Sequence, residues 1–272
     1  MDGHAPGVRG RTLNAYAAAG PGSDHECTTA EEALEKLRRG LFVFFREATN
    51  ARNLEDLLPA LTPGNRRRVA LCTDDRQPPD LLDEGGIDAM LRTCIRRGVQ
   101  PVEAIRLATL NPAEYFGLRD RGAVAPGRRA DLVVLDDLQE VDVRAVWCRG
   151  SPAARDLRPL DWDLPPAPAP PAPAMEIPWD EIGLRLPARE GAARVIRAVP
   201  DQIVTGHESV EPTVEEGAVV ADPSRDLLKI AVLERHRGSG RVGLGLVAGI
   251  GLREGAIAGT VAHDHHNLIV VG

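Results

Sequence analysis

The sequence is poor in aromatic side chains and in cysteine. Aromatic residues make up 3% of its 272 residues, so a core has to be built mainly from Leu, Val, Ile and Ala. The cysteines are far apart and form no Cys-x-x-Cys pair, at Cys27, Cys72, Cys94 and Cys148. This pattern is typical of reduced thiols, and it argues against a disulfide framework or a structural zinc site. We therefore expect a cytoplasmic protein.

The sequence also lacks a net positive charge and a long apolar run. Its formal net charge is −7, whereas non-specific nucleic-acid binding needs a basic face. No apolar run approaches the roughly 20 residues that a membrane-spanning helix requires, and residues 1–14 show no apolar core of a signal peptide. We expect neither nucleic acid nor a membrane as a partner. The content of 43% hydrophobic and 27% charged residues is ordinary for a soluble globular protein.

A proline-rich segment divides the chain into a larger N-terminal and a smaller C-terminal part. Residues 165–173 read PPAPAPPAP. Proline neither fits inside a helix nor donates to a strand ladder. We therefore predict a poorly ordered, solvent-exposed connection at this segment.

Helix and strand patterns alternate in the N-terminal part. Residues 28–40 predict a capped helix, because they begin with Thr, carry acids in the first turn and end on Gly. The other elements predicted there are strands over 41–47 and 67–75 and helices over 51–61, 86–99 and 101–118. This alternation predicts parallel βα units. Acids and histidines follow the apolar strands, where a (β/α) barrel keeps its active site.

Strand patterns dominate after residue 118. Short strands within 120–137 and 143–150 indicate a small β unit. Beyond the proline-rich segment, 227–235 and 241–247 predict a hairpin around Gly-Ser-Gly, and 267–272 is another apolar run. The predicted fold class is therefore α/β, followed by a part that is rich in β-strands.

Polar residues at the ends of predicted strands are the candidate metal ligands. His4 lies in the turn sequence DGHAPG, and His25 lies in SDHE beside Glu26. Asp74 and Asp75 close an apolar strand, and adjacent carboxylates at such a place need partners or a cation. His4, His25 and Asp74 together offer nitrogen and oxygen ligands for a divalent ion such as zinc, manganese or iron. The alternatives are a surface histidine, a solvated loop before a helix, and acids that cap a helix.

A second group of histidines lies near the end of the sequence. His263, Asp264 and His265 form His-x-His, and His266 and Asn267 follow. Alternate residues of a strand share a face, which favours metal binding, but the pattern also occurs by chance. A polar turn before the final apolar run is the alternative that we favour for the residues alone.

Several motifs, in order along both parts, resemble adenine deaminases of the amidohydrolase superfamily. They are DGHAPG, LNAYAAAG, SDHECTTAEEALEKLRRG, RNLEDLLPAL, TDDR, ATLNPAEYFGL, DRGAVAPGRRADLVVLDDL, VLERHRGSG, VGLGLV and GAIAGTVAHDHHNLIVVG. The resemblance covers nearly the whole chain outside the proline-rich segment. It is specific because the motifs recur in order, whereas no single one would support it.

The resemblance implies a domain organisation. Residues 1–119 are expected to form the second half of a (β/α)8 barrel, and 120–160 part of a flanking β-sandwich. A proline-rich linker is expected over 161–180, and an incomplete, β-rich α+β C-terminal domain over 181–272.

The resemblance also implies a reaction, the hydrolytic deamination of adenine to hypoxanthine and ammonia. The substrate is then a small purine base, and the cofactor is a divalent metal, manganese or iron, with zinc as the alternative. His4 and His25 resemble ligands after barrel strands five and six, and Asp74 resembles the strand-eight aspartate that also takes a proton from water. Glu26 and Asp75 are implied beside them in proton transfer. Contacts to the substrate or to a domain interface are implied for His263, Asp264, His266 and Asn267.

The sequence departs from this family at several places. The first-strand His-x-His and the strand-four carboxylate have no counterpart before His4, and family members continue beyond NLIVVG. Ser usually precedes His266, where this chain has His265. We therefore expect a chain truncated at both ends, with four parallel barrel strands and little activity alone, from a family whose full-length members are homo-oligomers. The alternatives are another cyclic amidohydrolase, of the dihydroorotase or imidazolone type, and a non-catalytic fragment.

Overall fold

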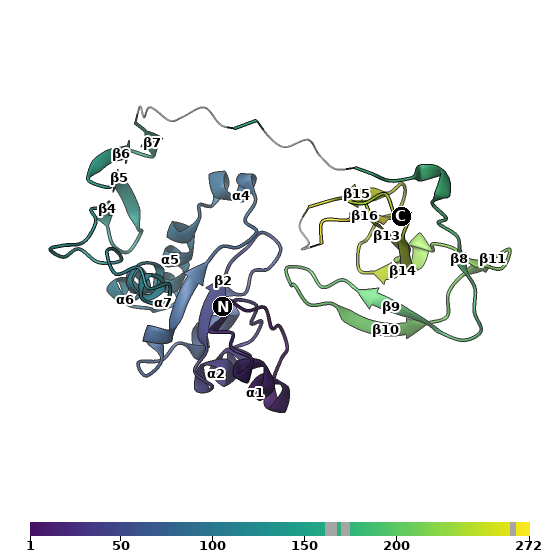
Figure 1. Cartoon of the computed structure of the whole chain (residues 1–272), viewed down its shortest axis with the longest axis horizontal. Coiled ribbons are helices and arrows are strands. Elements are labelled where there is room, and N and C mark those ends of the chain that lie inside the picture. The colour runs from purple at the N-terminus through teal and green to yellow at the C-terminus, as the bar shows by residue number, and fades with distance from the viewer. Residues whose placement is uncertain (161–167, 170–174, 262–264) are drawn as a thin grey trace. The chain divides into compact units, whose positions relative to one another are not determined.

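The computed structural model describes residues 1–160, 168–169, 175–261 and 265–272. The chain forms two compact units (Figure 1), a first unit of residues 1–165 and 201–203 and a second unit of residues 166–200 and 204–272. Most of the proline-rich segment, with His263 and Asp264, lies outside the described residues. In the described part of the chain, no helix is both long enough and apolar enough to cross a membrane.

The first unit begins with alternating helices and strands and ends in a small sheet. Its helices are α1 (Gly10–Ala18), α2 (Ala30–Arg38), α3 (Leu54–Leu57), α4 (Pro78–Asp83), α5 (Ile87–Arg96), α6 (Pro101–Ala108) and α7 (Leu110–Tyr115), with 3-10 turns η1 (Leu58–Ala60) and η2 (Arg66–Arg68). Its strands are β1 (Ser23–Asp24), β2 (Phe42–Arg46), β3 (Val69–Cys72), β4 (Leu132–Asp137), β5 (Asp142–Cys148), β6 (Ser151–Arg155) and β7 (Arg158–Pro159).

The strands β1, β2 and β3 form a parallel sheet in that order. Asp24 pairs with Val43 across β1 and β2, and Arg46 pairs with Cys72 across β2 and β3. Every residue of β2 is buried, as expected of a parallel strand that is covered on both faces. The carboxyl ends of the three strands therefore meet at one edge.

Four parallel strands were expected, and the described residues form three. The described residues before His4 form no strand. The Gly22 amide donates to the Met1 carbonyl at 2.8 Å, but the next backbone amides along this segment bond to side chains. The amide of Gly3 donates to Asp2 at 3.0 Å, and that of Ala5 donates to Asp24 at 2.7 Å. The chain around His4 is thus an irregular segment tied to β1.

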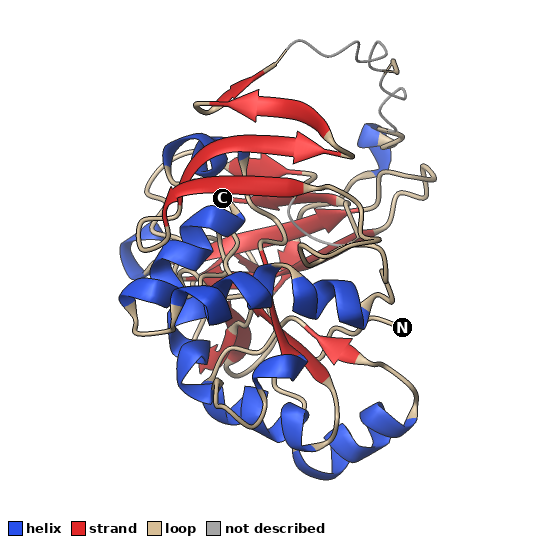
Figure 2. Cartoon of the chain, turned by 90° about the vertical axis from the view of Figure 1, so that its left-hand side faces the viewer, coloured by secondary structure: helices blue, strands red, loops and turns tan. Residues whose placement is uncertain are grey.

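The two faces of the parallel sheet bury different side chains. Val43 and Phe45 point to one face, where they pack with residues of α2, α3, α5 and α6 in the main core. Phe42 and Phe44 point to the other face and pack against Tyr115 at the end of α7. This alternation follows from the two-residue period of a strand. Figure 2 shows the helices (blue) alongside the strands (red).

Local sequence signals explain where the helices begin and end. The Thr29 side chain caps α2 by accepting the Glu32 amide at 3.3 Å, as the capped-helix pattern predicts. The single helix predicted over 101–118 is wrong: α6 ends at Ala108, and α7 starts after a break at Thr109. Pro112 causes the break, because it has no amide hydrogen for the carbonyl of Ala108 and its ring clashes there.

The remaining strands of the first unit form an antiparallel sheet in the order β4-β5-β6-β7. Leu135 of β4 and the buried Val141 join the main core beside the helices. The strands predicted within 120–137 and 143–150 correspond to β4 and β5.

The second unit consists mainly of strands. They are β8 (Leu186–Pro187), β9 (Ala193–Arg197), β10 (Gly206–Val210), β11 (Val214–Glu215), β12 (Ala218–Val219), β13 (Leu227–Leu233), β14 (Val242–Ala248), β15 (Ile257–Gly259) and β16 (Leu268–Val271), with 3-10 turns η3 (Trp179–Glu181) and η4 (Pro223–Arg225). One sheet has the order β10-β9-β14-β13-β16-β15, and the other has the order β11-β12-β8. The strands β13 and β14 pair antiparallel, which confirms the predicted hairpin.

The cysteines provide a test of this fold. Burial raises the pKa of Cys94 to about 12, and burial together with Asp74 raises that of Cys72 to about 12. Burial raises the pKa of Cys27 still further. Cys72 and Cys148 are both half-buried, but the raised pKa of Cys72 leaves it little thiolate. Since the thiolate is the reactive form, we expect only Cys148 to react rapidly with Ellman's reagent at about pH 8 in the native chain.

The full complement of thiols should react once the chain is unfolded in urea. Replacing Cys148 with Ser should abolish the rapid native phase and leave the slow thiols unchanged. Two or more rapid thiols in the native chain would contradict the raised pKa values of Cys27, Cys72 and Cys94.

Candidate metal centre

Two short segments carry the candidate donors. The His4 segment (residues 3–7) contains a turn, and the His25 segment (residues 25–28) follows β1 directly. Asp24, the last residue of β1, joins them, because its carboxylate accepts both the Ala5 amide and the Glu26 amide. Both segments therefore lie at the carboxyl edge of the parallel sheet.

The structure gathers His4, His25 and Glu26 into one donor group. One ligand atom from each residue lies within 4.8 Å of the others. His4 Nδ1 is 3.5 Å from Glu26 Oε1, and the two imidazole rings meet edge to face with centroids 4.5 Å apart. The His4 side chain is 59% exposed, against 13% for His25 and 17% for Glu26. The group is therefore open to solvent on the side of His4.

Asp74 lies next to this group, and Asp75 follows it in the chain. Asp74 follows β3, and its Oδ2 is 3.5 Å from His25 Nε2. Its backbone is left-handed, with φ of 53°, a conformation that Asp adopts more readily than most residues. Asp75 is exposed, and its backbone carbonyl accepts the Thr49 amide at 3.4 Å.

Arg46 is a residue of the site that the sequence analysis missed. It ends β2, and its Nη1 lies 2.6 Å from Asp74 Oδ2 and 3.5 Å from Glu26 Oε1. Its side chain is 5% exposed, and its Nε and Nη2 have no hydrogen-bond partner among the described residues. The sequence does contain a signal for Arg46: it is a single basic residue directly after the apolar run FVFF. It therefore ends a predicted strand, as Asp74 and Asp75 do.

Asp2 is the second missed residue, and it faces the other side of His25. Asp2 Oδ2 is 3.8 Å from His25 Nδ1, so the imidazole lies between Asp2 and Asp74. The other carboxylate oxygen of Asp2 accepts the hydroxyl of Ser23. Metal-binding histidines commonly use one ring nitrogen for the ion and direct the other to a carboxylate. Two imidazoles and a carboxylate fit zinc, manganese or iron by their donor chemistry.

The histidines near the end of the sequence belong to the second unit. His266 has a left-handed backbone before β16, and its Nδ1 is 3.1 Å from the Thr260 carbonyl. The Asn267 amide donates to His265 at 3.1 Å. Asn267 and His265 line a cavity of about 430 Å³ together with His236, which the sequence analysis did not single out. His263 and Asp264 lie outside the described residues.

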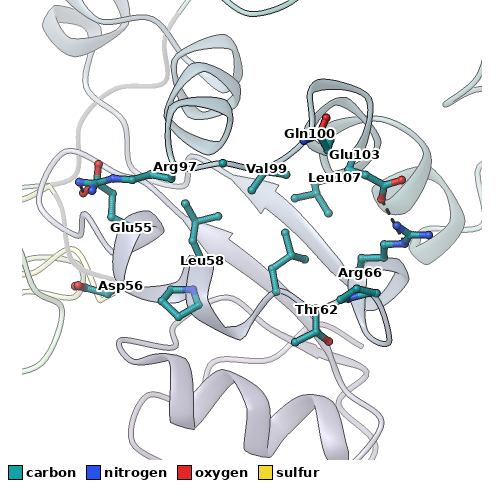
Figure 3. Close-up of a pocket in the computed structure, with 14 residues that line it drawn as sticks. Glu55, Asp56, Leu58, Thr62, Arg66, Arg97, Val99, Gln100, Glu103 and Leu107 are labelled. Atoms are coloured by element: carbon teal, nitrogen blue, oxygen red, sulfur yellow. Dashed lines mark hydrogen bonds and ion pairs between the residues drawn. The ribbon is translucent and has the colours of Figure 1, made fainter.

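A larger cavity, of about 650 Å³, lies away from the candidate donors (Figure 3). Leu58, Val99 and Leu107 contribute its apolar surface, and an ion pair between Arg66 and Glu103 lies at its edge. Arg66 comes just before β3, so this cavity lies near the amino end of that strand. In (β/α) folds the chemistry gathers at the opposite, carboxyl end.

Comparisons with known protein families cover most of the chain. The model of the amidohydrolase family matches residues 1–153. The model of the adenine deaminase C-terminal domain matches residues 202–272. The first match spans more than half of the sequence and includes every residue of the candidate metal centre. The chain belongs to the amidohydrolase family.

The similar curated proteins are named adenine deaminase. The chain is 51% identical to the adenine deaminase of Desulfatibacillum aliphaticivorans over 272 residues, which are all of this chain and 48% of that protein. It is 47% identical to the adenine deaminase of Methanothrix thermoacetophila over 271 residues, which are 99% of this chain and 47% of that protein. The chain thus spans about half the length of the curated relatives it matches.

Solved structures of lower similarity also match. An amidohydrolase from Thermotoga maritima aligns with 57% of this chain and 44% of its own, with 19% identity and a TM-score of 0.42. A β-aspartyl dipeptidase from Fervidobacterium islandicum aligns with 50% of this chain and 39% of its own, with 19% identity and a TM-score of 0.40.

The donor group predicts that His25 is essential for metal binding. Replacing His25 with Ala should weaken the binding of Mn²⁺ at least ~100-fold, since loss of a residue that merely supports a ligand already costs about 10–100-fold. Isothermal titration of the two proteins measures the change. His207→Ala is the matched control, because His207 is exposed on β10 of the second unit. Equal affinities of the three proteins would contradict the site.

The position of Arg46 predicts the opposite effect on metal binding. Arg46→Met removes a cation that pairs with Asp74 and Glu26. Its charge repels a bound divalent ion, and at about 6 Å this repulsion amounts to roughly 1.4 kcal/mol at the dielectric constant of water and to about 5.5 kcal/mol at an effective dielectric constant of about 20. We expect the affinity for Mn²⁺ to rise about tenfold in Arg46→Met and to stay unchanged in Arg46→Lys. Weaker binding in Arg46→Met would mean that the guanidinium chiefly holds the donors in place.

Proposed function

We propose that this chain serves the metal-dependent hydrolytic deamination of adenine to hypoxanthine and ammonia. The observation that carries the proposal is the group of His4, His25 and Glu26, whose ligand atoms lie within 4.8 Å at the carboxyl edge of a parallel sheet. The identity of about half of all residues with adenine deaminases supports the choice of adenine over other substrates of the family.

Three side chains are assigned to hold the cation. His4 and His25 each offer an imidazole nitrogen, and Glu26 offers a carboxylate oxygen. We assign the ion as manganese or iron, with zinc as the alternative. When bound, a divalent cation supplies Lewis-acid chemistry that makes water a nucleophile near neutral pH.

Asp74 is assigned as the base and, as in the sequence-based hypothesis, as a further ligand. Arg46 and His25 both contact its Oδ2, at 2.6 Å and 3.5 Å. Its Oδ1 is therefore the oxygen that we assign to accept the proton of the attacking water. A general base must reach the proton it removes, and Arg46 fixes Asp74 beside the donor group for this purpose.

An acid must then return a proton to the leaving amine. Asp75, which is exposed at the same strand end and is not among the assigned ligands, is the candidate for this step. Glu26 is the alternative only when it does not bind the cation, because a carboxylate that binds a metal ion is ionised and has no proton to donate. Adenine is neutral, so the net charge of −7 does not oppose its binding.

The domain organisation of the sequence analysis is part of this proposal. Three parallel strands with helices packed on one face are consistent with an arc of a (β/α)8 barrel. We assign that arc to residues 1–119, part of a flanking sandwich to 120–160, the linker to 161–180 and the C-terminal domain to 181–272. A homo-oligomer in the cytoplasm is proposed for the full-length family members.

The second unit is proposed to contribute to substrate binding or to a domain interface. The candidate residues are His263, Asp264, His266 and Asn267. The support for this role comes from Asn267, which lines a polar cavity with His236 and His265.

An assay of ammonia release from adenine tests the function. The chain is loaded with Mn²⁺ or Fe²⁺ and assayed first alone. It is then assayed together with the part of the Desulfatibacillum adenine deaminase that lies outside its alignment with this chain. We expect turnover of ~1–10³ per second with the added part and little turnover without it, because the described residues supply no more than the three ligands of the donor group and Asp74.

The matched variant for this assay is Asp74→Asn. Asn tolerates the left-handed backbone of this position but cannot accept the proton. Activity should fall at least ~100-fold, as expected when a general base is lost, while the protein still folds. Hydrolysis of a dihydroorotate or an imidazolone, without ammonia release from adenine, would instead identify another cyclic amidohydrolase.

A further inference from the structure

A fully buried lysine lies beneath the candidate metal centre. Lys36 of α2 has a side chain that is 0% exposed, and its Nζ lies 3.0 Å from Asp24 Oδ2 and 2.7 Å from Glu32 Oε1. The side chains of Asp24 and Glu32 are 0% and 3% exposed. We call these three residues the buried triad. A charge is costly to bury, and buried ion pairs are weak contributors to stability, so the triad calls for another explanation.

The buried triad binds the His4 segment (residues 3–7) at three points. Lys36 Nζ donates to the Ala5 carbonyl at 2.6 Å. The Ala5 amide donates to Asp24 Oδ1 at 2.7 Å, and the Gly7 amide donates to Glu32 Oε1 at 2.8 Å. The residue after His4 is therefore held through both its amide and its carbonyl.

The same carboxylates bind the His25 segment (residues 25–28). The Glu26 amide donates to Asp24 Oδ2 at 3.1 Å, and the Thr28 amide donates to Glu32 Oε2 at 3.1 Å. Lys36 bonds to both carboxylates, so it joins the two sets of backbone contacts into one network.

The charge state of Lys36 supports this network. Burial by itself lowers the pKa of Lys36, but Cys27, Asp24 and Glu32 together raise it by more, so the pKa lies above its usual value. The ammonium therefore stays protonated and keeps its donors for the two carboxylates and the Ala5 carbonyl.

We propose that Lys36 is a positioning residue for the metal centre. Through Asp24 and Glu32, it holds the His4 segment against the His25 segment and so sets the spacing between the imidazole and carboxylate donors. The inference depends on the proposed function in one respect, since it takes those donors as ligands of a divalent cation.

Cobalt binding by the full chain tests this proposal. The visible spectrum of bound Co²⁺ reports coordination geometry, and titration gives its affinity. Lys36→Met removes the ammonium. Lys36→Met with Glu32→Gln also removes it, but it keeps the net charge of the buried triad, because one positive and one negative charge are lost together. Urea unfolding without metal establishes that each variant is folded.

The matched control is Lys229→Met. Lys229 lies on β13 of the second unit, where its exposed ammonium donates to the Leu184 carbonyl. The control should bind Co²⁺ with the affinity and spectrum of the unmodified chain. The two Lys36 variants should bind about 10–100-fold more weakly, with an altered spectrum. A change in fold stability alone would not produce that spectral change.

The outcomes separate this inference from the proposed function. If the unmodified chain fails to bind Co²⁺, the metal centre itself is wrong. If it binds, and both Lys36 variants bind with the same affinity and spectrum, Lys36 is not a positioning residue. Should both variants be unfolded, Glu32→Asp decides by the same two measurements, because it keeps all three charges and shortens only one arm of the network.

Discussion

The parallel pairing of β1, β2 and β3 is the constraint from which the site follows. Because the strands are parallel, all three end at the same edge of the sheet. Residues that are far apart in the sequence therefore come together there. Asp24 and His25 follow from β1, Arg46 ends β2, and Asp74 comes after β3. Helices cover one face of the sheet and aromatic side chains cover the other. Both faces are therefore apolar, and the polar groups lie at the carboxyl edge.

Charge is arranged in two layers at this edge. The outer layer contains the imidazoles with Glu26, Asp74 and Arg46, and it is partly open to solvent. The inner layer is the buried triad around Lys36, which is closed to solvent. Carboxylates outnumber Arg and Lys side chains by two to one in both layers, so the edge has a deficit of positive charge that a divalent cation would compensate. The two layers are connected through the main chain, because Asp24 of the inner layer and Glu26 of the outer layer are separated by a single residue.

Local signals predicted much of the fold. Residues close together in the sequence were enough to predict several elements: the cap at Thr29, the apolar strands β2 and β3, and the β13–β14 hairpin. His4, His25 and Asp74 were singled out as ligands, and Glu26 as a proton-transfer candidate, because polar groups beside turns and strand ends are visible in the sequence. Arg46 and Lys36 were not found, because their partners are distant: Arg46 pairs with Asp74 28 positions away, and Lys36 with Ala5 31 positions away. The break at Thr109 was missed although Pro112 signalled it.

The left-handed backbone at Asp74 restricts which residue types this position tolerates. Most side chains are strained at φ of 53°, whereas Asn and Gly accept it at little cost. Neither of these replacements can take up a proton. The substitutions that the backbone tolerates best are therefore those that remove the carboxylate proposed as the base, so on that proposal a lineage could retain this architecture and lose its activity in a single step. A descendant with Asn at this position would look intact by its fold and its neighbouring histidines.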